Sequence, residues 1–135
     1  MSGTRFRHLQ RAIGLACAAC FAIPAYFSFH ARAASSAARA NVQTAITAAE
    51  AYSRGTGFYS GISGRRLRRQ TPGLDRNLRA VAVNGDAAYC LDDRVNGEVY
   101  DYVGGVPGGA LRDGHQPAVV EPGPCAAAVG APAVQ

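Results

Sequence analysis

Four cysteines are the residues with the most chemistry to offer, and they fall into two pairs. Cys90 and Cys125 lie outside the apolar N-terminal stretch, and an even pair in an oxidising compartment predicts one disulfide. The bridge would close a loop of 34 intervening residues, which stabilises a domain by about 3 to 4 kcal/mol in the chain-entropy model. Cys17 and Cys20 have the spacing of a redox or metal pair. Their apolar surroundings disfavour thiolates, so we interpret both as small packing residues.

The other candidate catalytic side chains lack partners in the sequence. His115 stands alone in a loop rich in Gly and Pro, without a metal-binding spacing. Ser60 and Ser63 miss the G-x-S-x-G elbow of a serine nucleophile. Asp92 and Asp93 are adjacent before a turn, where solvation at the surface explains them better than acid–base work. The sequence therefore predicts no enzyme, with no catalytic, metal or cofactor-binding residue and no cofactor.

A cluster of four arginines, Arg65, Arg66, Arg68 and Arg69, has two interpretations. It could bind an anion or a lipid headgroup. The favoured interpretation is a solvated helix face, because neither interleaved aromatic residues nor a glycine-rich cradle accompanies the arginines. Acidic residues further along the chain would then balance the charge: Asp92, Asp93, Glu98 and Asp101.

The formal charge of +5 is mostly an N-terminal feature. Of the 14 basic residues, four precede Ala34, which leaves ten Arg against nine acidic residues in the remainder. A nearly neutral domain has no general electrostatic attraction to nucleic acid, so we expect no nucleic-acid partner.

The same N-terminal charge orients an apolar segment. Arg5, Arg7 and Arg11 precede residues 13–29, which are 17 residues without a formal charge. The positive-inside rule keeps the arginines in the cytoplasm and exports the rest. We expect residues 1–12 to form a basic cytoplasmic leader and residues 13–30 a transmembrane or signal segment that contacts membrane lipid through residues 13–29.

Two fates of this segment stay open. A retained anchor is favoured, although its rise of about 25 Å as a helix is slightly short of the ~30 Å hydrocarbon core. The alternative is a secretory signal, cleaved between Ala33 and Ala34 after the small-residue motif Ala31-Arg32-Ala33. The first predicts a single-pass membrane protein with its C-terminal domain outside the cytoplasm, and the second a secreted protein.

Residues 31–125 read as an α+β domain. An Ala-rich helix over 34–53 is predicted from a buried stripe, and a short helix over 63–70 from Ser63 as its N-cap. Phe58 and Tyr59 are expected to pack. Antiparallel strands are predicted from alternation and from two Asn-Gly turns. They cover residues 78–83, 87–91 and 98–103, with a short last strand beginning at 110–111 and a flexible tail over 126–135.

The order of these parts resembles the type IV pilin and pseudopilin family, and in particular small exported pilin-like domains of actinobacteria. The matching residues are Glu50-Ala-Tyr52, Gly57-Phe-Tyr59-Ser-Gly61, Leu67, Pro72-Gly73-Leu74, Tyr89-Cys90-Leu91, Gly97 to Tyr100, Pro107-Gly108-Gly109 and Cys125. They span residues 13–125. The processing motif of the family differs here, since Leu15 follows Gly14 and Ala19 stands where the family has Glu.

The resemblance implies a long N-terminal helix packed on a small three- to four-stranded antiparallel sheet with one disulfide. It also implies a structural role as a minor subunit of a type IV pilus or pseudopilus, with self-association or binding of other pilin-like subunits through the helix. The alternative is a secreted, disulfide-bonded binding protein. Its ligand surface would be the face of Tyr89, Tyr100 and Tyr102, or the loop near Pro107.

Overall fold

A computed structural model of the chain describes residues 3–106 and 115–128, with side chains from Ile23 onward except that of Ala127. The chain divides into two units, Met1–Ala33 and Ala34–Gln135. Helix α1 (Gly3–Thr56) contributes residues to both. Each unit is considered by itself.

In the first unit the described residues are helical, and Pro24 lies inside the helix. Ile23, Tyr26, Phe27 and Phe29 are all more than half exposed. Over the residues with described side chains, none of the helices is long and apolar enough to cross a membrane. Residues 13–22 of the predicted membrane-directed segment lie outside that range.

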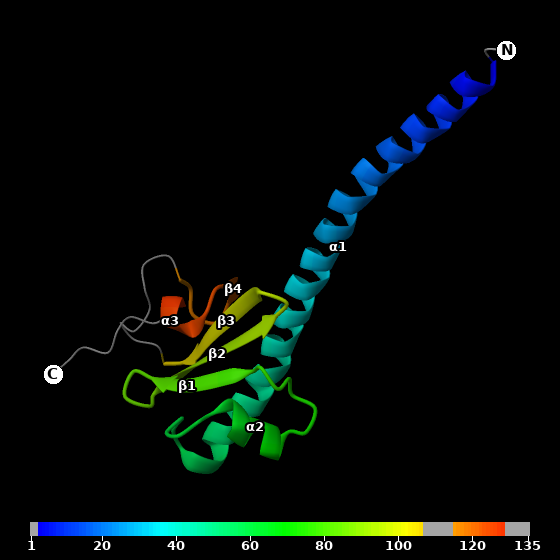
Figure 1. Ribbon diagram of the computed structural model, residues 1–135. Coiled ribbons are helices and arrows are strands. Elements are labelled where there is room, and N and C mark those ends of the chain that lie inside the picture. The colour runs from blue at the N-terminus through cyan, green and yellow to red at the C-terminus, as the bar shows by residue number, and fades with distance from the viewer. Residues whose placement is uncertain (1–2, 107–114, 129–135) are drawn as a thin grey trace. The chain divides into compact units, whose positions relative to one another are not determined.

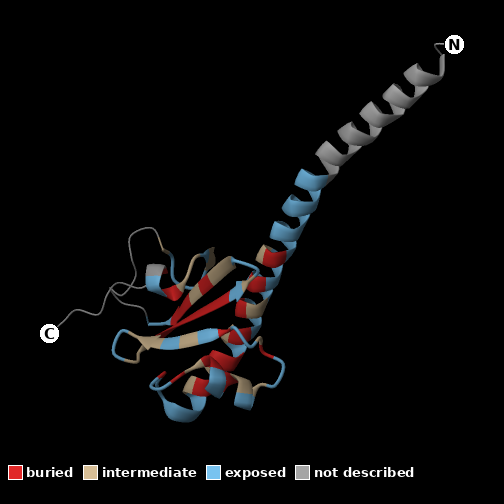
Figure 2. Cartoon of the chain, in the orientation of Figure 1, coloured by how far each residue is buried: buried red, intermediate tan, exposed pale blue. Residues whose placement is uncertain are grey.

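In the second unit, α1 buries one stripe against a four-stranded sheet (Figure 1). Val42, Ala45, Ala49 and Tyr52 are buried at spacings of three, four and three residues. Together with Ile46, which is only half-buried, they form the stripe predicted from helical periodicity. Figure 2 shows buried positions along this part of α1. Because these side chains are mostly small, the helix can lie close to the sheet.

The sheet is antiparallel throughout and its strands follow chain order, β1-β2-β3-β4. They are β1 (Arg79–Val83), β2 (Ala88–Val95), β3 (Glu98–Gly105) and β4 (Val120–Pro122). The predicted α+β fold, with one long helix on a small antiparallel sheet and one disulfide, is confirmed. Both Asn-Gly turns form as predicted, since Asn and Gly tolerate the positive φ angles that such turns require.

Alternation along the strands gives the sheet two different faces. Tyr89 and Leu91 face α1 and belong to the main core. Cys90 and Val103 point to the opposite face, where they pack against the short helix α3 (Cys125–Ala128). The disulfide therefore belongs to a second, smaller core on the side of the sheet away from α1.

Helix α2 (Gly64–Gln70) forms where the sequence predicted it. The Ser63 hydroxyl accepts a hydrogen bond from the backbone N–H of Arg66 at 3.3 Å, which caps the helix. Leu67 is fully buried. A Cβ at Gly64 would lie 2.0 Å from the Leu78 carbonyl oxygen, so only glycine permits this close approach to the residue preceding β1.

Three predictions about the edges of the domain need correction. Phe58 does not pack, since 63% of it is exposed, whereas Tyr59 is buried as expected. The predicted flexible tail is wrong for residues 126–128, which are helical and bury Ala128. The described last strand is β4, which was not predicted, while residues 110–111 and 129–135 lie outside the described residues.

Candidate functional site

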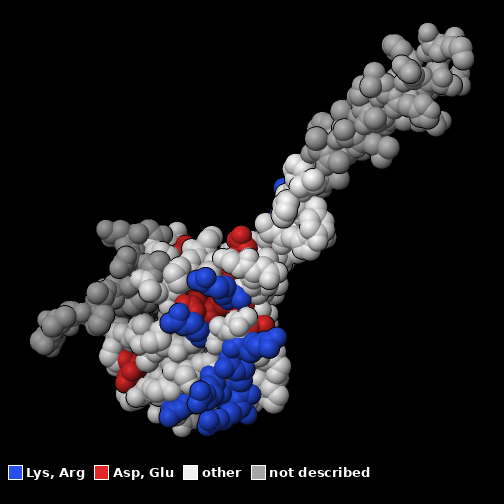
Figure 3. Space-filling model, in the orientation of Figure 1, with Lys and Arg blue, Asp and Glu red and all other residues white. Residues whose placement is uncertain are grey.

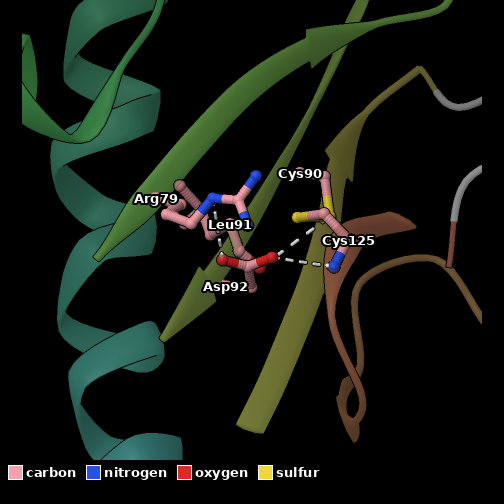
Figure 4. The surroundings of a disulfide bond; sticks show 5 residues. All are labelled: Arg79, Cys90, Leu91, Asp92 and Cys125. Carbon is pink, nitrogen blue, oxygen red and sulfur yellow. Dashed lines mark hydrogen bonds and ion pairs between the residues drawn. A yellow bond between two sulfur atoms is a disulfide. The ribbon is translucent and has the colours of Figure 1, made fainter. Parts of the chain in front are cut away.

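The predicted disulfide is present and ties the C-terminal segment to the second strand. Cys90 and Cys125 are joined with their Cα atoms 5.8 Å apart, within the usual range for a disulfide. The backbone N–H of Cys125 also donates to Asp92 Oδ2 at 2.9 Å, as Figure 4 shows. A covalent bond and a hydrogen bond thus hold α3 at neighbouring positions of β2.

On the same face of the sheet, a row of charged residues crosses all four strands. Arg79 pairs with Asp92, Asp92 with Asp101, and Asp101 with Glu121. The Nε atom of Arg79 lies 3.8 Å from Asp92 Oδ1, and Nδ1 of His115 lies 3.1 Å from Glu121 Oε2. Three carboxyl groups therefore stand side by side, with a basic group at each end of the row.

The prediction that Asp92 and Asp93 are solvated at the surface is wrong. Only 4% of Asp92 and 1% of Asp93 is exposed, because β2 continues through both residues. Asp93 faces α1, where the Asn41 side-chain amide donates to its Oδ2 at 2.7 Å. This partner comes from a distant part of the chain, and the other carboxyl oxygen of Asp93, Oδ1, has no hydrogen-bond partner among the described residues.

Asp101 is the member of the row with the least favourable surroundings. It is 2% exposed, and its Oδ2 atom has no hydrogen-bond partner among the described residues. Burial raises the pKa of Asp101 to about 6, with His115 opposing the shift and Glu121 and Asp92 adding to it. Burial also raises the pKa of Asp93, against the hydrogen bond from Asn41. Alternation along the strand places Asp101 on the same face as Val99 and Val103, but it does not predict that Asp101 is buried.

The tyrosine face suggested as a ligand surface lies under α1. Tyr89 is fully buried, and its hydroxyl donates to Glu50 Oε1 at 2.6 Å. Tyr59 donates to the other carboxylate oxygen of Glu50 at 3.1 Å. Burial, with the hydrogen bond to Glu50, raises the pKa of Tyr89, so Tyr89 stays a neutral donor. The Tyr89 part of the predicted ligand surface is therefore internal structure, and Pro107 lies outside the described residues.

The arginine cluster is not balanced by the acids proposed for it. Asp92, Asp93 and Asp101 are buried elsewhere, and no described ion pair joins an α2 arginine to an acid. Arg66 instead donates to the Tyr52 hydroxyl at 3.1 Å, and Arg68 donates to the carbonyls of Asp75 and Leu78. In Figure 3 a broad band of basic side chains covers the region of α2. We define the arginine surface as Arg65, Arg66, Arg69 and the exposed Arg76 that follows α2.

The outward face of α1 in the second unit carries a row of small side chains. Ala37, Ala40, Thr44, Thr47 and Ala51 are all exposed and repeat at spacings of three and four residues. This periodicity is that of a helix seam that faces a neighbouring helix. We call these five residues the small-residue stripe.

The remaining predicted candidates have local roles. Ser63 caps α2, and the Ser60 carbonyl accepts a hydrogen bond from the Tyr52 hydroxyl at 2.7 Å. His115 contacts Glu121. Over the described residues, no group of three or more His, Cys, Asp or Glu side chains could hold a metal ion.

Comparison with known proteins finds no matching family model, curated protein or solved structure. The class that the described residues define is an α+β domain with one helix on a four-stranded antiparallel sheet and a disulfide-linked C-terminal segment.

Proposed function

We propose that this chain is a non-enzymatic structural or interaction protein, a pilin-like domain held outside the cytoplasm by its membrane-directed segment 13–29. In this role it acts as a minor subunit of a type IV pilus or pseudopilus and contacts membrane lipid and other helices of its own kind. The observation that carries the proposal is that the two faces of α1 have different surroundings. One face of the helix is buried in the main core, and the opposite face exposes the small-residue stripe to solvent.

The stripe suits a second helix because small side chains let two backbones approach closely. The exposed Ile23, Tyr26, Phe27 and Phe29 support the same proposal, since four large apolar side chains within seven residues favour lipid or protein over water. These four residues form the C-terminal end of the arginine-led apolar segment 13–29, which is predicted to enter the membrane.

Cross-linking along the stripe tests this proposal. In a chain with Cys17 and Cys20 replaced by Ala, single cysteines at Ala40 or Thr47 are expected to cross-link to another copy or to another envelope subunit in intact cells. A cysteine at Asn84, exposed in the first hairpin turn, is the matched control and should stay monomeric. Equal cross-linking at all three positions, or none at Ala40 and Thr47, would contradict a helix-mediated assembly.

A second candidate function is a cleaved, secreted binding protein, and one observation favours it. The boundary between the two units falls between Ala33 and Ala34, the bond predicted for signal cleavage. The main core and the disulfide lie within Ala34–Gln135. Cleavage there would leave the main core complete, so the identity of the first residue of the exported chain separates the two functions.

A further inference from the structure

The charges of the second unit are sorted by depth. Every described Asp and Glu in it is buried or half-buried, whereas every described Arg except the half-buried Arg68 is exposed. A domain that is nearly neutral by residue count therefore presents a basic exterior. Composition does not reveal the basic exterior, because it counts buried and exposed charges equally.

The arginine surface is the densest part of that exterior. Arg65 and Arg69 are four residues apart on α2, so they project from one side of the helix. Within the described residues, the side chains of Arg65, Arg69 and Arg76 have no hydrogen bond or ion pair. Their guanidinium groups are consequently available to an anion from outside the domain.

Arg66, the remaining member of the arginine surface on α2, is held in place by hydrogen bonds. Its Nη1 atom donates to the Tyr52 hydroxyl, and the same hydroxyl donates to the Ser60 carbonyl. These contacts place the Arg66 guanidinium beside Ser60, two residues after the exposed Phe58. The Arg66 guanidinium thus lies beside the loop that carries the large exposed aromatic residue Phe58.

From this arrangement we infer that the arginine surface, with Phe58, is a docking site for an anionic phospholipid surface. Arginine side chains would pair with headgroup phosphates, and Phe58 would enter the boundary between headgroups and acyl chains. The inference goes beyond the proposed function, and the surface lies wholly in Ala34–Gln135, so it holds for an anchored or a cleaved chain.

Other partners fit this surface less well. A second copy would bring another basic exterior, since the described acids are mostly buried or half-buried. Single-stranded nucleic acid is bound through several aromatic stacking platforms, and the exposed aromatic residue here is Phe58. An acidic protein is usually held by a cluster of buried anchors at the centre of an interface, for which one phenylalanine is insufficient.

Vesicle binding tests the inference with the full chain held in nanodiscs of neutral phosphatidylcholine. We expect it to bind separate vesicles that contain phosphatidylglycerol and not vesicles of phosphatidylcholine alone. The double variant R65Q/R69Q should bind about 10- to 30-fold more weakly, given the usual contribution of each arginine near an anionic membrane. Binding should also weaken as salt is raised.

Two further variants make the test specific. R39Q/R94Q removes the same charge from arginines elsewhere in the domain and is expected to lose no more than about threefold, as a nonlocal effect of net charge. Phe58→Ser should weaken vesicle binding several-fold with the charge intact. Equal binding to neutral vesicles, an equal loss in R39Q/R94Q, or tighter binding to DNA than to anionic vesicles would each overturn the inference. Circular dichroism and intact mass would verify the fold and disulfide of each variant.

Discussion

Asp101 is a buried carboxyl group whose protonation should make the stability of the domain depend on pH. Its carboxyl group stands between Asp92 and Glu121 on neighbouring strands, with Arg79 and His115 as the facing basic groups. Since the pKa rises from 3.8 to about 6 on folding, the folded chain binds more protons than the unfolded chain between these values. Asp101 therefore lowers the free energy of unfolding as the pH rises through this window.

Replacing Asp101 with Asn should remove this dependence. The introduced amide cannot ionise, and it can donate to the neighbouring carboxylates. We expect the Asp101→Asn variant to be more stable than the wild type by on the order of 2 kcal/mol at neutral pH, with little difference near pH 4. Urea unfolding of the full chain in neutral detergent at several pH values measures this. Asp86→Asn, in a hairpin turn outside the row, is the control. An unchanged slope between pH 4 and 6 in Asp101→Asn would refute the assignment.

At the scale of elements, the contact of α2 with the residue preceding β1 depends on the absence of a side chain. A Cβ at Gly64 would collide with the Leu78 carbonyl oxygen, which is backbone and cannot move away cheaply. Gly64→Ala should therefore destabilise the domain by about 3 kcal/mol or more, as overpacked core sites do.

Gly55→Ala is the matched control, because Gly55 is helical and nothing lies within 4 Å of its added Cβ. That variant should be neutral or more stable by about 0.5 kcal/mol. Thermal melting of both variants measures the difference, and equal melting temperatures would contradict the close packing.

The C-terminal segment depends on the second strand through the disulfide. Reduction, or the pair of substitutions Cys90→Ser and Cys125→Ser, should lower the free energy of unfolding by about 3 to 4 kcal/mol. Hydrogen exchange should quicken first in 120–128, since β4 is only three residues long and α3 four. The strands β2 and β3 should keep their protection because they pair along eight residues. Uniform loss of protection across the whole sheet would show that the bridge does not act locally.

Local signals in the sequence predicted the Ala-rich part of α1, the short helix α2 and the first three strands. Asn84-Gly85 and Asn96-Gly97 require backbone angles that few other residues adopt, so both turns were visible without tertiary information. Strand β4 was not visible, because Val120-Glu-Pro122 lacks alternation and ends in proline. It is a strand because β3 offers an edge and the disulfide holds the following residues nearby.

The candidate site was harder to predict than the fold for a related reason. Asp92 and Asp93 are tolerated inside a strand because Cys125, Arg79 and Asn41 reach them from other elements. The basic exterior likewise appears only when burial is known. Residue types indicated the disulfide correctly, but the environment of each charge is a property of tertiary structure.

At the scale of the whole molecule, we propose that the chain stays at the membrane and presents its second unit outside the cytoplasm. This proposal depends on the arginine-led segment 13–29 and the exposed apolar residues that end it. We propose that this unit has two separate faces for interaction, the small-residue stripe for helices and the arginine surface for anionic lipid.

Intact-mass measurement of the chain from membrane and medium fractions distinguishes a retained membrane anchor from a cleaved signal. We expect a species in the membrane fraction that retains the apolar segment, with one disulfide between Cys90 and Cys125. A membrane species cut after Gly14, which keeps residues 15–29, would also support assembly of the pilin type. A chain in the medium that begins at Ala34, with none retained in membranes, would contradict membrane anchoring and establish the secreted alternative.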